Sequence, residues 1–311
     1  MKKLQLLLLV AFFTIICSAP AFAGTAGQII FGVDQHGGFH LEAYDLDNPT
    51  ASPKFIGNIP TEVENLTGVG GGIFYGIQSN GGTNCLYEFK VGGSYSDGYT
   101  MSEKLISDAI GHSNIDSMDW DGTNLYAISN NSVTGNATTL FKLGLDGSVV
   151  GTDINLDSSG GFNTLRNDKF EGMAYNVADG YFYLSYTHKF VTVDGVIQKD
   201  VNNKPIWSEK SDLFKMDSSG NLTLLGIMGY AQVEALTFID GALYGVSDGT
   251  DNLFEINFDV DGNFTGTGDG STWKHDIEGM AVGSTVPIPG AIWLLGSGLM
   301  GLVGFKRRKK S

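Results

Sequence analysis

Cysteine and arginine are the side chains that this sequence has least of. Of its two cysteines, Cys17 lies in an apolar N-terminal run with the features of a signal peptide, which leaves only Cys85 in the remainder. No intrachain disulfide can therefore form in the exported part. Arg166 is the only arginine between the two ends of the chain, which excludes a clamp of several arginines for phosphate esters. The fold must be stabilised by a buried core.

Positive charge is also scarce, and much of it lies at the two ends. The net charge is −15 at pH 7 although residues 2–3 and 306–310 contribute seven positive charges, so the stretch between them is more acidic than the whole. Nucleic-acid binding needs cations that neutralise phosphates, so nucleic acid is excluded as a partner. Small cations are natural partners of such a surface, and solubility is the alternative explanation.

The N-terminus has the three parts of a secretory signal. Two lysines precede an apolar run over residues 4–17, and Ala-Phe-Ala at 21–23 fits an A-x-A cleavage site. A lipoprotein site at Cys17 is disfavoured because the bulky Ile16 precedes it. We predict a signal peptide over residues 1–23 and an exported protein.

The C-terminus resembles a membrane stop. Residues 286–305 carry no charge, and five cations follow at 306–310. Twenty apolar residues at about 1.5 Å each span a hydrocarbon core, and the basic cluster is expected to stay on the cytoplasmic side. A buried core helix is the alternative, but a glycine-rich chain end closed by cations favours a transmembrane helix.

Between the ends, one pattern occurs five times. It consists of an apolar residue, an acid, a small or polar residue, and Leu or Met, followed by a turn and an aromatic β-run. The acids, separated by 52, 55, 63 and 44 residues, are Glu64, Asp116, Glu171, Glu234 and Glu278. This period, with several short strands per unit, is typical of a β-propeller. We predict an all-β, five-bladed β-propeller over residues 24–285; six blades, the alternative, would need one more unit.

The first and last units are incomplete in complementary ways. The segment that starts at residue 27 matches the second and third strands of a unit but lacks the first, and IEGMAV at 277–282 matches a first strand with nothing after it. We therefore predict that the N- and C-terminal strands meet in one blade, which closes the ring and leaves only short edges.

The predicted blades place their connections on two faces. The turns after the first and third strands are Asp-Gly pairs, in which both central residues favour positive φ; we call their side the turn face and expect it to be purely structural. The opposite side, the loop face, carries long polar loops and an insertion from about residue 189 to 211. Loops that lengthen on one face of a repeat scaffold are usually the binding loops. The candidate binding residues there are His112, His188, Trp207 and His275.

The five acids begin the innermost strands and are expected to converge at the channel mouth on the loop face. Close carboxylates raise one another's pKa or recruit a cation, and an oxygen-rich, thiol-free site in an exported protein suits Ca²⁺. All five acids are therefore candidate metal ligands. The alternative is that each acid accepts hydrogen bonds from backbone N–H groups of a neighbouring blade.

The motif GVSDG, residues 245–249, matches the nucleophile elbow G-x-S-x-G. That elbow needs a strand-to-helix turn in an α/β sheet. The repeat instead places Ser247 at the end of a second strand, equivalent to Ser129 and Ser185. We interpret the match as chance.

The C-terminal 26 residues resemble a PEP-CTERM sorting signal, with a proline motif, an apolar helix and a basic end. The motif here is Val286-Pro287-Ile288-Pro289, a VPIPG-type variant in which Ile288 stands where the family's name motif has Glu. The resemblance implies that an exosortase-like sorting protease acts near Pro287 and Pro289. It also implies transient inner-membrane anchoring, then transfer to the cell surface or extracellular matrix, in a biofilm or exopolysaccharide context.

The repeat FEGMAY, with DG and FYLS after it, is also similar to propellers of the phytase-like esterase and lactonase type. That resemblance implies channel-mouth acids that hold Ca²⁺, although the single arginine does not suit a phosphate substrate. We expect a non-enzymatic binding or matrix protein whose partners are a polysaccharide or other surface proteins. The alternative is a Ca²⁺-dependent ester or lactone hydrolase, with a histidine such as His112 or His275 as its base.

Overall fold

The computed structural model of this chain describes residues 29–34, 38–48, 51–59, 63–80, 83–130, 138–156, 169–188, 192–193, 196–204, 206, 210–272 and 277–282. The predicted signal peptide, sorting motif and C-terminal helix lie outside these residues and stay predictions. Within these ranges, no helix is long and apolar enough to cross a membrane.

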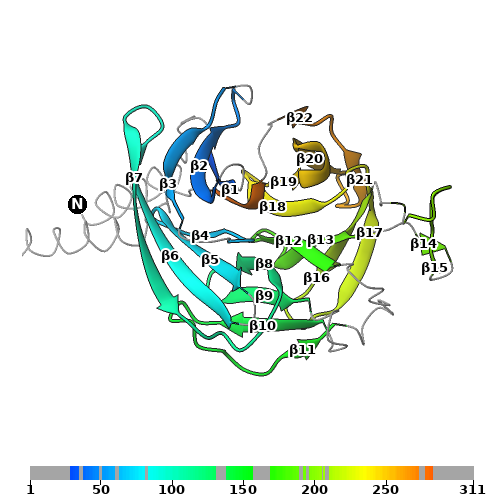
Figure 1. The fold of residues 1–311 in the computed structure, drawn as a ribbon, viewed down its shortest axis with the longest axis horizontal. Helices are drawn as coiled ribbons and strands as arrows, with labels where there is room; N and C mark the ends of the chain where they lie inside the picture. Colours follow the sequence, from blue (N-terminus) through cyan, green and yellow to red (C-terminus); the bar gives the residue numbers. More distant parts are fainter. Residues whose placement is uncertain are drawn as a thin grey trace, which may run out of the picture.

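Five antiparallel sheets are arranged around a common centre (Figure 1), which confirms the five-bladed propeller. From the innermost strand outward, blade 1 consists of β23 (Ile277–Val282), β1 (Ile29–Asp34), β2 (His40–Asp45) and β3 (Lys54–Asn58); blade 2 of β4 (Thr67–Gly70), β5 (Ile73–Asn80), β6 (Thr83–Ser94) and β7 (Gly98–Ser107); and blade 3 of β8 (Ile115–Trp120), β9 (Leu125–Ser129), β10 (Thr139–Leu143) and β11 (Ile154–Asn155). Blade 4 consists of β12 (Lys169–Asn176), β13 (Tyr181–Thr187), β16 (Ser211–Met216) and β17 (Leu222–Met228), and blade 5 of β18 (Val233–Ile239), β19 (Ala242–Ser247), β20 (Asn252–Phe258) and β21 (Phe264–Thr267), with β22 (Ser271–Thr272) also paired to β20.

Blade 1 is built from both ends of the chain, as the incomplete repeats predict. Strand β23 pairs antiparallel with β1, with Ile30 opposite Val282 and Gly32 opposite Met280. Because β1 then pairs with β2 and β2 with β3, the last strand of the propeller supplies the innermost strand of the first blade. Ring closure therefore depends on six residues near the C-terminus.

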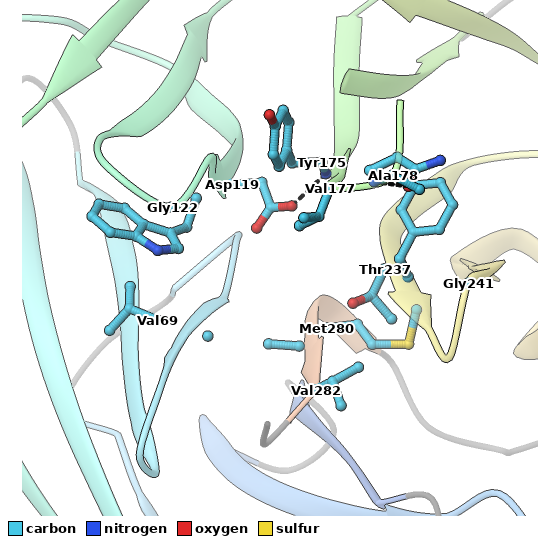
Figure 2. A pocket seen from close by; sticks show the side chains of 15 residues that line it. Val69, Asp119, Gly122, Tyr175, Val177, Ala178, Thr237, Gly241, Met280 and Val282 are labelled. Atoms are coloured by element: carbon cyan, nitrogen blue, oxygen red, sulfur yellow. Dashed lines mark hydrogen bonds between the residues drawn. The ribbon is translucent and has the colours of Figure 1, made fainter. Parts of the chain in front are cut away.

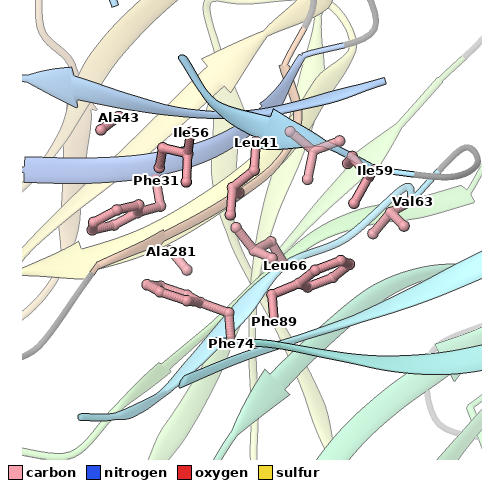
Figure 3. Packing of buried hydrophobic residues seen from close by; sticks show 11 residues of the cluster. Phe31, Leu41, Ala43, Ile56, Ile59, Val63, Leu66, Phe74, Phe89 and Ala281 are labelled. Carbon is pink, nitrogen blue, oxygen red and sulfur yellow. The ribbon is translucent and has the colours of Figure 1, made fainter. Parts of the chain in front are cut away.

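The hydrophobic core is divided into five clusters, one between each pair of adjacent blades. Figure 3 shows the cluster between blades 1 and 2, in which Phe31 and Leu41 face Phe74 and Phe89. The rings of Phe31 and Phe74 lie 4.8 Å apart, within the range of favourable aromatic pairs. No blade buries its apolar face alone, so the ring is stable only when all five blades are packed.

The tight turns lie on the turn face, but most of them are not the turn type that the Asp-Gly pairs predict. Among the five Asp-Gly pairs in these turns, both residues have positive φ only at Asp240-Gly241. In the turns at Asp121, Asp146 and Asp179, the Asp side chain accepts a hydrogen bond from the backbone N–H two residues on, and only the glycine has positive φ. The aspartate side chain thus closes these turns itself.

The insertion on the loop face forms the predicted hairpin. Strands β14 (Thr192–Val193) and β15 (Val196–Ile197) pair as a separate two-stranded sheet, which projects from the ring at the right of Figure 1. Apart from the single 3₁₀ turn η1 (Asp248–Thr250), the residues that the structure describes contain no helix.

Removing β23 is expected to unfold the whole propeller. A chain that ends at His275 loses the buried side chains of Ile277 and Met280, each of which stabilises the fold by about 1.5–3 kcal/mol. Together they amount to much of the roughly 5–15 kcal/mol of a typical domain. Thermal melts should show a cooperative transition for a chain that ends at Thr285 and none for the shorter chain.

A point variant in the full chain tests the same closure. Ile277→Ala should lower the free energy of unfolding by about 2–5 kcal/mol, because Ile277 is fully buried between blades 5 and 1. The control Ile227→Ala, on a side chain that is 60% exposed in β17, should change it by less than about 0.5 kcal/mol. Equal denaturation midpoints for the two variants would contradict the assigned role of β23.

Candidate functional site

The repeated acids stand at the loop-face ends of the innermost strands because the backbone bulges there. In four blades the acid is an extra residue that the neighbouring strand does not match, namely Asp116 in β8, Glu171 in β12, Glu234 in β18 and Glu278 in β23. The fifth acid, Glu64, lies three residues before β4. A bulge redirects its side chain, and here it directs the acids to the axis of the ring.

The five acids do converge. The charges of Asp116 and Glu278 act on Glu64, and those of Glu171 and Glu278 act on Glu234. Glu171, Glu234 and Glu278 line a central cavity of about 10 Å³, the room needed by about one water molecule. The predicted acid ring is therefore present in the structure.

A lysine that sequence reasoning missed lies in this ring. The Nζ atom of Lys169 is 2.8 Å from Oε1 of Glu171 and 3.5 Å from Oδ2 of Asp116. Burial lowers the pKa of Lys169, but the charges of Asp116, Glu171 and Glu64 outweigh burial and raise it, so the ammonium stays charged. The chain thus places its own cation among the acids.

The remaining charge is reduced by protonation. Burial, followed by the hydrogen bond and the charge of Asp116, raises the pKa of Glu64 to about 10. Burial also raises the pKa of Glu171, against the opposing Lys169, and the pKa of Glu234, where Glu171 and Glu278 add to the effect. Glu64 is therefore neutral at pH 7, and one oxygen each of Glu64, Glu171 and Glu234 is buried with no hydrogen-bond partner.

Among the described residues, the acids are not grouped as a Ca²⁺ site. This ion takes six to eight oxygen ligands at about 2.3–2.6 Å. Within the described ranges, no three His, Cys, Asp or Glu side chains are placed so that they could hold a metal ion. The ammonium of Lys169 already lies beside two of the five acids. The calcium site stays a prediction, and we derive no chemistry from it.

Two asparagines near the acids make polar links between neighbouring blades. Asn130 at the end of β9 donates to the carbonyl of Phe170 in blade 4 and accepts from its N–H, at 2.7 and 3.0 Å. Asn65 donates to the carbonyl of Ile115 in blade 3 at 3.0 Å. The inter-blade backbone contacts that the alternative hypothesis assigned to the acids are thus made, in these blades, by asparagines.

Of the candidate binding residues on the loop face, the structure describes the two histidines. His112 precedes β8, stacks on Phe141 with ring centres 3.9 Å apart, and places Nε2 3.6 Å from Oδ1 of Asp153. His188 follows β13, with Nε2 3.0 Å from Oδ2 of Asp212. Both lie at the same ends of the sheets as the acids. Trp207, His275, Pro287 and Pro289 lie outside the described residues.

Ser247 is structural, as the repeat predicts. It ends β19 in an extended conformation (φ −105°, ψ 116°), and its Oγ donates to the carbonyl of Ala231. A nucleophile elbow instead holds its serine in a strained turn with Oγ exposed. The match to G-x-S-x-G is therefore a coincidence of the repeat.

A second hollow opens on the turn face, which we had expected to be purely structural. It has a volume of about 620 Å³ and is shown in Figure 2. One repeat position contributes to its walls in all five blades. It lies four residues after each acid and is occupied by Gly68, Trp120, Tyr175, Phe238 and Val282. Three consecutive blades thus contribute an aromatic ring. We call this hollow the turn-face pocket.

Asp119 is the one carboxylate among the described residues that line the turn-face pocket, and none of these residues is Lys, Arg or His. It accepts hydrogen bonds from the backbone N–H of Tyr175, at 2.6 Å, and from the hydroxyl of Thr67. Burial raises its pKa to about 6, against the opposing effect of these hydrogen bonds. The corresponding position in the other four units holds Thr or Ala.

Comparison with known proteins finds distant structural similarities that add nothing to the fold described above. No protein-family model and no curated protein matches this chain. Solved structures that resemble it include a chain of the nidogen/laminin complex, with 11% identity over 84% of this chain and 99% of that one and a TM-score of 0.48. The periplasmic gluconolactonase of Pseudomonas aeruginosa has 10% identity over 83% and 99%, with a TM-score of 0.42. TolB of Acinetobacter baumannii has 10% identity over 83% and 67%, also with a TM-score of 0.42. Similarities this distant carry no argument about function.

The raised pKa values predict that the protein loses stability as the pH rises. A carboxyl whose pKa is higher in the folded state stabilises that state fully below its unfolded pKa, about 4.3, and the effect is lost as the pH passes its folded pKa. For Glu64, the pH range over which this stabilisation is lost extends from about 4.3 to about 10. Urea unfolding at pH 5, 7 and 9 should show falling stability, and Glu64→Gln should flatten the decline. The control Glu103→Gln, on an exposed side chain of β7, should leave the decline unchanged; the same slope in both variants would refute the buried-acid explanation.

Removing the internal cation should destabilise the ring. Lys169→Met leaves Asp116 and Glu171 without their cation and should lower the free energy of unfolding at pH 7 by about 2–3 kcal/mol. This is less than the roughly 3–5 kcal/mol for a fully buried pair, because 39% of the Lys169 side chain is exposed. The control Lys90→Met breaks the pair of Lys90, whose side chain is 59% exposed, with Glu88 and should cost less than about 1 kcal/mol. Equal losses in urea titrations would mean that Lys169 is an ordinary surface charge.

Proposed function

We propose that this protein is an exported, surface-sorted binding protein without catalytic activity, which presents the loop face of its propeller to a polysaccharide or another surface protein. The observation that carries this proposal is the position of Lys169. Its ammonium lies among the acids that a Ca²⁺-dependent hydrolase would use to hold its metal. With a fixed internal cation, the acid ring serves as part of the scaffold.

The path of the chain supports a loop face that points outward. Strand β23 runs from the acids to the turn face and ends there at Val282. The predicted transmembrane segment starts at residue 286, and the residues between span at most about 14 Å when extended. An anchored protein would therefore hold its turn face close to the membrane and its loop face away from it.

The sorting signal supports the same location. A sorting protease that acts near Pro287 and Pro289 would release the propeller from its anchor after all of its strands. The described propeller already ends at Val282, so cleavage at this motif leaves the ring closed. The protein would then reach the cell surface or the extracellular matrix as a folded unit.

The loop face offers a surface that can be altered without disturbing the ring. The insertion between β13 and β16 forms its own hairpin, and Thr187 pairs directly with Ser211 at its base. His188, next to this base, is bonded to Asp212. A short linker can therefore replace the insertion while blade 4 is kept.

The test replaces residues 190–210 of the full chain by a Gly-Ser linker and measures attachment to cells and to their isolated exopolysaccharide. We expect attachment to fall at least tenfold, because the insertion supplies the largest loop of the loop face. The matched control Glu171→Gln changes the acid ring and should attach normally. The same two variants are assayed for ester and lactone hydrolysis. Attachment without the insertion, or a hydrolytic activity that Glu171→Gln abolishes while the fold is kept, would refute the proposal and favour the hydrolase.

A further inference from the structure

The turn-face pocket has the size and form of a small-molecule site. Its volume of about 620 Å³ lies within the roughly 300–1,000 Å³ of ligand pockets, which are mostly apolar with a few polar groups that converge. It is also on the face opposite to the insertion and the acid ring. It is therefore independent of the binding surface proposed above.

The walls of the pocket are aromatic and accessible. Trp120, Tyr175 and Phe238 are only half-buried although they are large and apolar. At the rim, Val177 is 86% exposed. In Figure 2 the side chains of Asp119, Tyr175 and Val177 lie together at one side of the hollow. Exposed apolar side chains that gather in one concave place indicate a binding site.

The electrostatics of the pocket favour a positive ligand. Asp119 is held in position by Thr67 and the backbone of Tyr175, and no lysine or arginine is among the described lining residues. The nearby charges that act on Tyr175 are also acidic, Asp121 and Asp179. The ammonium of Lys215 is bonded to Asp179 at 3.0 Å. Phosphates, sulfates and carboxylates are therefore disfavoured.

We propose that the turn-face pocket binds a small organic ammonium ion with an apolar body. The ammonium group lies against the carboxylate of Asp119, and the apolar body lies between the rings of Trp120, Tyr175 and Phe238. Aromatic faces attract cations through their quadrupole, and this attraction increases when water is excluded. One carboxylate and three aromatic rings thus form a complete site for one positive charge on an apolar group.

Three probes of the same shape test the charge preference in the full-length chain. Isothermal titration calorimetry compares 2-phenylethylammonium, 2-phenylethanol and phenylacetate, with titrations into protein-free buffer or micelles subtracted. We expect the ammonium probe to bind at least tenfold more tightly than the alcohol, and phenylacetate not to bind. Equal affinities, a preference for the alcohol, or no binding of any probe at millimolar concentration would overturn the proposal.

Two variants locate the site. Asp119→Asn should bring the ammonium probe to within about twofold of the alcohol, whereas the control Asp261→Asn, on an exposed hairpin away from the pocket, should change nothing. Asp119 also bonds to neighbouring blades, so Val177→Lys gives a second test on a side chain that is exposed at the rim. The added cation should repel the ammonium probe and allow phenylacetate to bind. An unchanged preference in Val177→Lys would place the binding elsewhere and refute the proposal.

The pH dependence adds a test that needs no variant. Since the pKa of Asp119 is about 6 and an alkylammonium stays charged up to about pH 10, affinity for the ammonium probe should rise between pH 5 and 7 as Asp119 ionises. Affinity for the alcohol should stay constant over the same range. Affinity for the ammonium probe that does not change with pH would mean that Asp119 is not its partner.

Discussion

The structure depends on the close approach of five innermost strands around one axis. The residue after each acid lies where one blade meets the next, and it is always small or polar, namely Asn65, Ser117, Gly172, Ala235 and Gly279. A Cβ atom at Gly279 would lie 2.6 Å from the backbone nitrogen of Leu66, and one at Gly172 would lie 2.9 Å from Leu236. Small or polar residues at this position let the innermost strands come close together, and the five apolar clusters then fill the spaces between the blades. The close packing of these strands also brings the five acids together at the axis.

Like charges that converge in a buried place must be compensated. This chain does so by two means, the ammonium of Lys169 and the protonation of Glu64, whose pKa is raised to about 10. Both means work without a bound ion. The ring of acids therefore does not by itself indicate a metal or a reaction. The turn-face end of the same strands differs from the acid ring. One carboxylate, Asp119, lies there among aromatic rings, and the described residues that line the turn-face pocket include no cation.

The repeat was sufficient to predict the fold because each unit must satisfy the same packing. The five blades, the composite blade closed by residues 277–282, the convergence of the acids and the structural role of Ser247 are all confirmed. Lys169, Asp119 and the turn-face pocket were missed because they depend on how several blades meet at the axis. An alignment of the five units nevertheless shows that Lys169 and Asp119 are exceptions to the repeat. Lys169 is the one cation two residues before an acid, and Asp119 is the one charge three residues after an acid.

These exceptions to the repeat indicate where a function can lie. A ring of equivalent units offers the same groups in every direction, so it cannot orient an asymmetric ligand. Orientation requires positions at which one blade differs from the others. Blade 3 contributes Asp119 to the turn-face pocket, and blades 3 to 5 contribute aromatic rings where blades 1 and 2 have Val282 and Gly68. In the part of the chain that the structure describes, blade 4 alone carries an inserted hairpin, β14–β15, on the opposite face. The two proposed binding surfaces therefore correspond to two places where this propeller departs from its own symmetry. Each surface can change without affecting the other because the closed ring lies between them.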